Sequence, residues 1–344
     1  MAFLLLLALT GCGMSDRIEQ IAPKREKDKK ESVTTYKVAI VQYDDHASSN
    51  QIISNIEGEL DKKSDELGVV FDYAGYTFNS QADPSTLDQI ADEISSEKVD
   101  VIIPISTPVA QVMQSVTEES GTPVIFSSVS DPVGAGLVTS LESPGGNITG
   151  VSDALDTVTV MNLMLAARPD IRKVGLLYDT DQEASTLSIK TAKSILDEKG
   201  IAWEEETGHD PETIGKAADT LLANKVEAVF TPTDNTVMSA ELELYQKFIQ
   251  ARVPHFAGAD SFALNGAFCG YGVNYREAGK DTADMAVEVL VNKKDPANIP
   301  VKTLENGIAT INIETAEALG IDYSSFSKIC SEVVETTTRQ EFDD

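Results

Sequence analysis

The chain is short of several residue types on which whole classes of protein depend. Its 344 residues include three cysteines, three histidines and one tryptophan, and aromatic residues make up 6% of the total. So few cysteines and histidines exclude a disulfide-stapled fold and a histidine-rich metal site. Positive charge is also scarce, because 27 Lys and Arg stand against 56 Asp and Glu, which gives a net charge of −29. A surface this acidic repels phosphate backbones, so we expect no nucleic-acid partner.

The sequence also lacks the motifs of common enzymes. It contains no GxxxxGK[ST] phosphate loop, no GxSxG nucleophile elbow and no GxGxxG dinucleotide fingerprint. His46, His209 and His255 are far apart, and none stands at metal-ligand spacing from a cysteine. We interpret each histidine as a surface residue or a satisfied loop residue. The sequence therefore predicts no catalytic residue, no metal site and no cofactor.

The N-terminus indicates a cellular location. Residues 3–9 are apolar, but a bilayer span needs about 20 residues, so this run fits the hydrophobic core of a secretory signal. Gly11 and Cys12 follow, which resembles the bacterial lipoprotein signal, although no Lys or Arg precedes the apolar run. We predict that residues 1–12 are a lipoprotein signal peptide ending at a lipidated Cys12. Such a protein is extracytoplasmic and anchored to the cell membrane by its lipid.

The segment after the predicted anchor differs from the rest of the chain. Residues 13–35 are polar and charged and cannot bury apolar surface, so we expect a flexible linker. From residue 36 onward, short apolar runs alternate with segments of helical periodicity. Strands are predicted at 37–41, 69–73, 99–104 and 123–126, and helices at 49–67, 84–96 and 108–118. This alternation predicts a mostly parallel sheet with helices on both faces.

The second half of the chain repeats the first. Apolar runs at 172–178, 226–232 and 253–257 match the first, third and fourth strands of the first half in order and character. The repeat predicts an α/β fold of two similar doubly wound, Rossmann-like lobes with a ligand cleft between them. In such sheets ligands bind beyond the carboxyl ends of the strands. The residues that directly follow each strand are therefore the candidates for ligand contact.

In the first lobe, Ser106 and Thr107 follow a predicted strand and precede Pro108. Proline favours the first helical position, so one of the two hydroxyls is expected to cap a helix. Hydroxyls and free N–H groups at a helix N-terminus also suit a carboxylate. The alternative is a cap that serves only its own helix. We interpret both residues as ligand contacts.

In the second lobe, Asp234 and Asn235 stand at the equivalent position. A carboxylate there would accept from an ammonium group, so the two lobes together suit a zwitterion. The alternative for Asp234 is an ordinary helix cap. Asp260, after the next strand, is a second candidate acceptor or a residue that orders its loop.

Four further candidates follow other predicted strands. Gln42 and Tyr43 come after the first strand, and the Tyr43 ring would either stack on a ligand or cover the cleft. Ser128 follows the fourth strand. Ser185 follows the matching first strand of the second lobe and would cap a helix and face the ligand.

Several of these segments together resemble one protein family. The segments are 41–43 (VQY), 104–111 (PISTPVAQ), 128–138 (SVSDPVGAGLV), 232–237 (PTDNTV) and 256–262 (FAGADSF). With them the chain resembles the substrate-binding component of an ABC importer, of the type I periplasmic-binding-protein fold, in the subfamily that includes tryptophan and tyrosine binders. The resemblance covers roughly residues 36–320. It implies a monomer that closes around an amino-acid-like ligand, first an aromatic amino acid, and delivers it to an ABC permease.

The resemblance also implies where the lobes begin and end. The glycine-containing stretch at 145–152 is interpreted as the first of three crossovers. The family pattern places the others near 270–275 and 300–307. Lobe 1 is then expected at 36–150 plus about 274–304, and lobe 2 at 151–273 plus about 305–330. Residues 331–344 are expected to form an acidic C-terminal tail.

Other functions stay open at this point. A module that senses a ligand for a receptor would share the fold, and the ligand could be a branched-chain amino acid, a nucleoside or a sugar. A racemase-like enzyme is disfavoured because Cys269 and Cys330 do not stand at matching positions of the two halves. The effector domain of a repressor is disfavoured because an apolar segment replaces the basic DNA-binding segment. Cys269 and Cys330 could equally be bridged or free.

Overall fold

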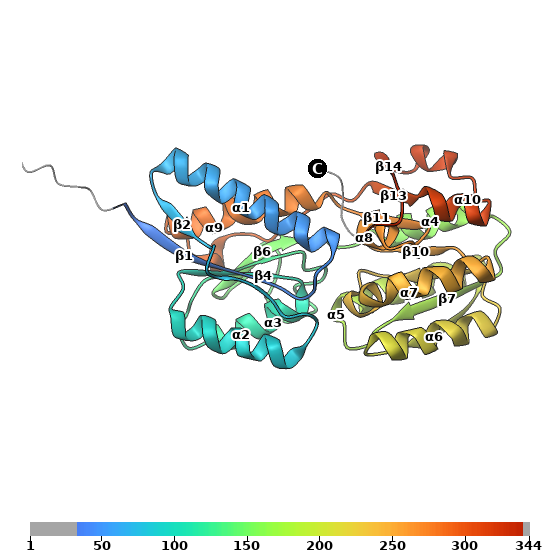
Figure 1. Cartoon of the computed structure of the whole chain (residues 1–344), viewed down its shortest axis with the longest axis horizontal. Coiled ribbons are helices and arrows are strands. Elements are labelled where there is room, and N and C mark those ends of the chain that lie inside the picture. The colour runs from blue at the N-terminus through green and yellow to red at the C-terminus, as the bar shows by residue number, and fades with distance from the viewer. Residues whose placement is uncertain (1–32, 340–344) are drawn as a thin grey trace, which may run out of the picture. The chain divides into compact units, whose positions relative to one another are not determined.

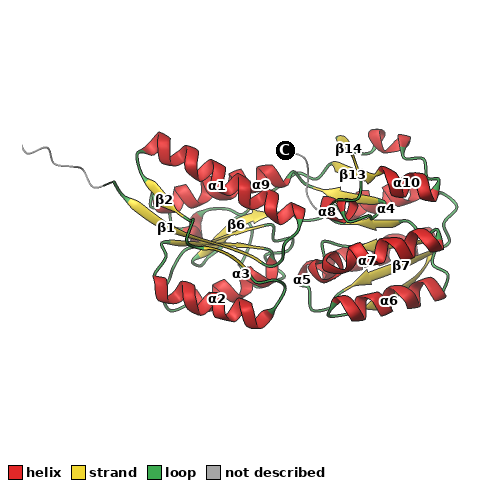
Figure 2. Cartoon of the chain, in the orientation of Figure 1, coloured by secondary structure: helices red, strands yellow, loops and turns green. Residues whose placement is uncertain are grey.

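In the computed structural model, which describes residues 33–339, two seven-stranded sheets each carry helices on both faces (Figures 1 and 2). This confirms the predicted α/β fold of two similar lobes. The predicted signal peptide, Cys12 and all but the end of the predicted linker lie outside the described residues. Among the described residues, no helix combines the length and the apolar character that a membrane span requires.

The sheet of lobe 1 has the strand order β12-β6-β5-β4-β1-β2, and β3 also pairs with β1. All of its pairings are parallel. The strands are β1 (Thr35–Gln42), β2 (Val70–Asp72), β3 (Thr77–Asn79), β4 (Val101–Ile105), β5 (Val124–Ser127), β6 (Ile148–Ser152) and β12 (Lys302–Thr303). The helices are α1 (Ala47–Leu67), α2 (Pro84–Glu97), α3 (Thr107–Thr117), α9 (Tyr275–Leu290) and the short η1 (Pro296–Asn298).

Strand β1 shows why both faces of this sheet are covered. Its side chains alternate between the faces, and both sets are apolar. Val38 and Ile40 pack in one cluster with α1 and α9, whereas Ala39 and Val41 pack in another with α2 and α3. Figure 1 shows the two helix pairs on opposite sides of the sheet.

The sheet of lobe 2 has the order β14-β13-β11-β10-β9-β7-β8, in which only the β11–β13 pairing is antiparallel. The strands are β7 (Lys173–Tyr178), β8 (Ala202–Thr207), β9 (Ala228–Thr231), β10 (His255–Ala257), β11 (Cys269–Gly272), β13 (Ile308–Asn312) and β14 (Glu332–Thr336). The helices are α4 (Thr157–Ala167), α5 (Glu183–Lys199), α6 (Pro211–Ala223), α7 (Asn235–Ala251), α8 (Asp260–Leu264), α10 (Ile313–Leu319) and η2 (Ser324–Lys328).

Two expectations about the lobe boundaries are wrong. The stretch at 145–152 is not a flexible crossover, because residues 148–152 form β6, a fully buried strand that pairs with β5. Residues 332–336 are not part of a tail, because they form β14 and pair with β13 at the sheet edge. The chain passes between the sheets at 153–156, 273–274 and 304–307, so each crossover is a short segment next to a strand.

The strand order places one switch point in each sheet. In lobe 1 the chain first builds outward from β1 to β2 and then continues on the other side with β4. In lobe 2 it does the same from β7 to β8 and then to β9. A crevice opens at the carboxyl ends of the two strands at such a point. The residues after β1 and β4, and those after β7 and β9, are therefore placed to form a ligand site.

Candidate functional site

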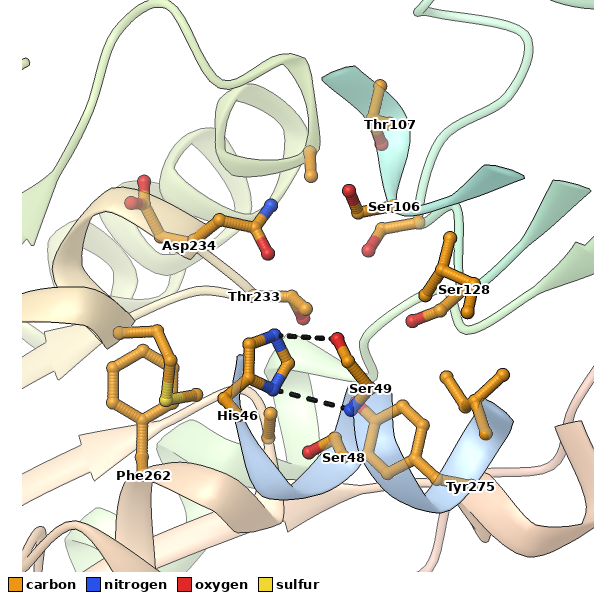
Figure 3. Close-up of a pocket in the computed structure, with 17 residues that line it drawn as sticks. His46, Ser48, Ser49, Ser106, Thr107, Ser128, Thr233, Asp234, Phe262 and Tyr275 are labelled. Carbon is orange, nitrogen blue, oxygen red and sulfur yellow. Dashed lines mark hydrogen bonds between the residues drawn. The ribbon is translucent and has the colours of Figure 1, made fainter. Parts of the chain in front are cut away.

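A pocket lies between the lobes, at the carboxyl ends of the switch-point strands (Figure 3). Both lobes contribute to its wall. The lining residues from lobe 1 are His46, Ser48, Ser49, Ile52, Ile105, Ser106, Thr107, Ser128, Ser130 and Tyr275. Those from lobe 2 are Ala184, Thr233, Asp234, Asn235, Met238, Ala259 and Phe262.

Ser106 is a buried polar residue of this wall whose hydroxyl is left without a partner. It stands at the N-cap position of α3, but its side chain makes no capping hydrogen bond, and its φ is 81°, a left-handed backbone conformation. The residue is 7% exposed, and its Oγ has no hydrogen-bond partner. The first N–H groups of α3 also lack intrahelical acceptors. A buried polar group left unpaired costs free energy, so this corner of the pocket favours a ligand oxygen.

Gln42 lies beside Ser106 at the same edge of the sheet. It pairs in register with Ile105, the residue before Ser106. Gln42 is 7% exposed, and its Oε1 also has no hydrogen-bond partner. The side chain is not part of the pocket wall, nor is that of Tyr43. The switch point of lobe 1 therefore holds two buried polar groups with unused hydrogen-bonding capacity.

The switch point of lobe 2 is different, because its carboxylate is already engaged. Asp234 caps α7 by accepting from the Val237 N–H at 3.0 Å, and its other oxygen accepts from the Asp179 N–H at 2.8 Å and the Ser185 Oγ at 2.6 Å. Burial raises its pKa to about 6. Ser185 is fully buried in this network and is not among the residues that line this pocket, and the ligand contact expected there stays a prediction.

Ser128 is held in the pocket wall by a carboxylate that the sequence analysis did not identify. Its Oγ donates to Asp153 Oδ2 at 2.5 Å, and the Ser130 Oγ donates to Oδ1 at 2.9 Å. Asp153 is buried, which raises its pKa against the effect of these hydroxyls and of the Tyr275 hydroxyl. Asp153 directly follows β6. It escaped notice because residues 148–152 were not expected to form a strand.

The first turn of α1 also contributes to the pocket, although the helix was expected to begin two residues later. His46 is its N-cap and accepts from the Ser49 N–H at 3.4 Å, and its ring lies beside the Ser49 Oγ at 3.0 Å (Figure 3). Burial lowers the pKa of His46, which favours the neutral ring. The signal that could have located it is an acceptor side chain three residues before Ser49, the spacing of a helix cap.

Asp260 is not among the residues that line this pocket, and the ligand contact expected there stays a prediction. Its Oδ1 accepts instead from the Ser48 Oγ at 2.7 Å, across the boundary between the lobes. Burial raises the pKa of Asp260 to about 6.

Part of the wall is apolar or aromatic. Ile52 and Ile105 come from lobe 1, Met238 and Phe262 from lobe 2, and Tyr275 from the start of α9. No Lys or Arg lies among the lining residues of this pocket. The pocket thus combines hydroxyls and a helix N-terminus with an apolar surface, an arrangement typical of small-molecule sites.

Comparisons with known proteins agree with this geometry. A family model of ABC transporter substrate binding proteins matches residues 37–334. The chain belongs to this family. A tyrosine-binding protein of Clostridioides difficile is 30% identical in an alignment of 332 positions that covers 93% of this chain and 90% of that protein.

Solved structures of relatives share the fold. A Streptococcus pneumonia ABC domain in complex with L-Trp is 27% identical, with a TM-score of 0.79 over 88% of this chain and 100% of its own. A ligand-free, open substrate binding protein with adhesive properties from Clostridium difficile is also 27% identical, with a TM-score of 0.66 and the same coverage. As an ABC substrate-binding protein, the chain functions outside the cytoplasm.

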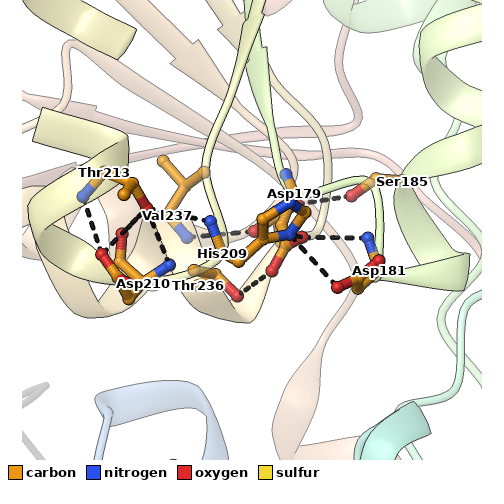
Figure 4. Close-up of polar contacts among 9 residues, drawn as sticks. Asp179, Asp181, Ser185, His209, Asp210, Thr213, Thr236 and Val237 are labelled. Carbon is orange, nitrogen blue, oxygen red and sulfur yellow. Dashed lines mark hydrogen bonds and ion pairs between the residues drawn. The ribbon is translucent and has the colours of Figure 1, made fainter. Parts of the chain in front are cut away.

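This substrate-binding protein has a second polar cluster, at the edge of lobe 2 (Figure 4). The His209 Nδ1 lies 2.7 Å from Asp179 Oδ1 and 3.2 Å from Asp181 Oδ2. One nitrogen or oxygen atom from each of the three side chains lies within 4.8 Å of the other two. Asp179 is buried and also accepts from the Thr236 Oγ1 at 2.7 Å. The two carboxylates raise the pKa of His209. These contacts tie the loops after β7 and β8 to the start of α7.

The remaining histidine and the cysteines belong to the interior of lobe 2. His255 is not a surface or loop residue, because it lies in β10 and is 1% exposed. Its ring contacts Glu241 Oε1 at 3.0 Å and Thr231 Oγ1 at 2.8 Å. Cys269 and Cys330 are both buried and free, and burial raises the pKa of the Cys330 thiol to about 11.

Proposed function

We propose that this substrate-binding protein captures a zwitterionic, neutral amino acid between its lobes, with an aromatic amino acid as the first candidate. The observation that carries the proposal is the buried, unpartnered Ser106 Oγ in the pocket wall, at the N-terminus of α3. The ligand carboxylate would accept from this hydroxyl and from the free N–H groups of the helix. Thr107 lines the pocket beside it.

The charges of the pocket narrow the ligand class. Because no Lys or Arg lines the pocket, one carboxylate can be held by hydroxyls and a helix N-terminus, but a second one would find no countercharge. Asp234 supplies negative charge on the opposite wall, and its three hydrogen bonds leave one of its roughly four acceptor positions for an ammonium group. Asn235 lines the pocket beside it. Acidic amino acids are therefore expected to bind worst.

The apolar wall and the relatives both support an aromatic side chain. Phe262, Met238 and Tyr275 offer a surface on which a ring can pack, and sulfur–aromatic and ring–ring contacts favour aromatic partners. The similar proteins include one that binds tyrosine and one solved with L-Trp. A branched aliphatic side chain fits the same surface and is the second candidate.

The cellular setting is part of the proposal. The apolar residues 3–9 followed by Cys12 support a lipid anchor in the cell membrane. The partner that receives the ligand would be an ABC permease in that membrane. We expect a monomer, because the two lobes have to open and close around the ligand.

The test is a calorimetric binding series with matched ligands. L-tyrosine and L-tryptophan should bind more tightly than L-leucine, and L-glutamate should bind weakest. Tyramine lacks the carboxylate, and 3-(4-hydroxyphenyl)propionate lacks the ammonium group, so each should lose most of the affinity of L-tyrosine. Tight binding of tyramine would contradict the carboxylate site at Ser106. Binding of a sugar or a nucleoside but of no amino acid would overturn the proposed ligand class.

A further inference from the structure

Three side chains connect the lobes on one side of the pocket. The Ser48 N–H in the first turn of α1 donates to the Ser261 Oγ at 2.8 Å, and the Ser48 Oγ donates to Asp260 Oδ1 at 2.7 Å. The two serine hydroxyls also contact each other. Ser48 and Ser261 are 3% and 1% exposed, so water competes little for these hydrogen bonds. Residues more than 200 positions apart thus join the N-terminus of α1 in lobe 1 to that of α8 in lobe 2.

These contacts lie next to the crossovers. Helix α1 packs closely on α9, since a Cβ added at Gly279 would lie 2.5 Å from the Ile52 carbonyl oxygen. Helix α9 begins at Tyr275, directly after the second crossover, and the Tyr275 hydroxyl interacts with Asp153 in the first crossover. The first turn of α1 is therefore attached to the segments about which the lobes would rotate.

The same contacts also position the pocket wall. Ser48 and its neighbours His46 and Ser49 line the pocket from lobe 1, and Ala259 and Phe262, on either side of the Asp260–Ser261 pair, line it from lobe 2. A displacement between α1 and α8 would therefore change the distance between the two walls. Errors of about 1 Å in such positioning are enough to weaken a site strongly.

We propose that Ser48, Asp260 and Ser261 form an interlobe clasp that stays closed with and without ligand and serves as the fulcrum of lobe closure. Asp260 is then a positioning residue for ligand binding, not a ligand contact. The part of this inference that concerns affinity rests on the proposed function. The part that concerns lobe motion does not.

The first measurement needs no ligand. Spin labels at Ser96→Cys on α2 and Thr220→Cys on α6, in a chain that carries Cys12→Ser, report the distance between the lobes; both helices lie on the same side of the two sheets (Figure 1). The native Cys269 and Cys330 are buried, so they should label slowly. Asp260→Ala and Ser48→Ala should each broaden the ligand-free distance distribution. Ser54→Ala, on an exposed position of the same helix, should leave it unchanged.

The second measurement is the affinity for L-tyrosine and L-tryptophan. Asp260→Ala should weaken binding about ten-fold, because ligand binding then also has to order the loosened lobes. Asp260→Asn keeps an oxygen that accepts from Ser48 and should restore most of the affinity and the narrow distance distribution. Ser48→Ala removes the same hydrogen bond together with the hydroxyl contact to Ser261, so its effect should be at least as large as that of Asp260→Ala in both measurements.

The outcomes separate the two proposals. If Asp260→Ala weakens binding but leaves the ligand-free distance distribution as it is, Asp260 acts on the ligand itself and the clasp is wrong. Unchanged distances and unchanged affinity would also overturn it. If the wild-type protein binds neither amino acid, the proposed function fails, while the ligand-free distances still decide whether the clasp exists.

Discussion

The two lobes share a sheet order around their switch points, yet they differ in whether the buried polar groups there have hydrogen-bond partners. In lobe 1, Gln42 and Ser106 are buried with unused hydrogen-bonding capacity. In lobe 2, the equivalent strand ends carry Asp179 and Asp234, whose oxygens accept hydrogen bonds from their own lobe. In the pocket wall itself, the Ser106 hydroxyl of lobe 1 is left for a ligand, whereas the Asp234 carboxylate of lobe 2 is held by hydrogen bonds within its own lobe. This difference predicts that substitutions in lobe 2 mainly change stability and those in lobe 1 mainly change binding.

The largest loss of stability is expected from a substitution in the interior of lobe 2. His255 and Glu241 form a fully buried pair, whereas the matching position of lobe 1 is Val124, which is equally buried. Glu241→Ala should lower the free energy of unfolding by about 4 kcal/mol, because it removes the buried carboxylate that pairs with the His255 Nδ1. The double variant Glu241→Leu with His255→Val, which imitates lobe 1, should recover much of this loss. Urea unfolding measures both, and a double variant as unstable as the single one would argue against the comparison.

The next largest loss of stability is expected when the hydrogen-bond network around Asp234 is broken. Asp234→Ala should lower the free energy of unfolding by about 3 kcal/mol, because it removes the α7 cap and leaves two further buried donors without an acceptor. Chemical denaturation of the ligand-free protein checks this. Asp210→Ala, which removes the exposed cap of α6, is the matched control and should cost about 1 kcal/mol. Equal losses would mean that the buried network adds nothing to an ordinary cap.

The buried carboxylates Asp234 and Asp260 also predict how the stability of the protein depends on pH. Burial raises the pKa of Asp234 and of Asp260 to about 6, above the unfolded value of 3.8. The native state therefore binds these protons more readily than the unfolded state, and stability should rise as pH falls from 7 to 5, by about 1 kcal/mol for each group. The lowered pKa of His46 acts in the opposite direction below pH 6.5. Thermal unfolding of the wild type and of Asp260→Asn should show a smaller pH-dependent gain in the variant.

The smallest expected change in stability is at Ser106. Ser106→Ala removes a hydroxyl that has no partner, so the free energy of unfolding should change by less than about 0.5 kcal/mol. Affinity for the amino acid should nevertheless fall about ten-fold, because a hydrogen bond to the ligand carboxylate is lost. Calorimetric titration and urea unfolding of the same sample separate the two effects. A large loss of stability without a change in affinity would contradict the assignment of Ser106 in lobe 1 to ligand binding.

Much of the fold could be predicted because its signals are local. Each strand of the repeated units is a short apolar run followed by a helical segment, and the repeat itself pointed to two lobes. Several strands were missed, and two of them, β6 and β14, lie where a crossover and a tail were expected because they lack such signals. The sequence ITGVS of β6 contains a glycine, and EVVET of β14 contains two glutamates. Each becomes a strand because a neighbour in the sheet, β5 or β13, supplies its hydrogen bonds.

Only some residues of the site could be predicted from the sequence. Ser106 and Asp234 could be located because they directly follow strands that the apolar pattern reveals. His46 and Ser48 precede or begin a helix, and Asp153 follows a strand that was not recognised. The partner of Asp260 could not be inferred at all, since Ser48 lies in the other lobe.

The sequence by itself therefore determined the alternation of strands and helices, the duplication and the residues at the strand ends, because these depend on periodicity and on neighbours along the chain. Only the tertiary structure decided which polar groups are satisfied and which are left for a ligand. Burial and hydrogen bonding depend on what packs from other parts of the chain. Asp234 finds three donors in its own lobe, Asp260 finds Ser48 in the other, and the Ser106 hydroxyl finds none.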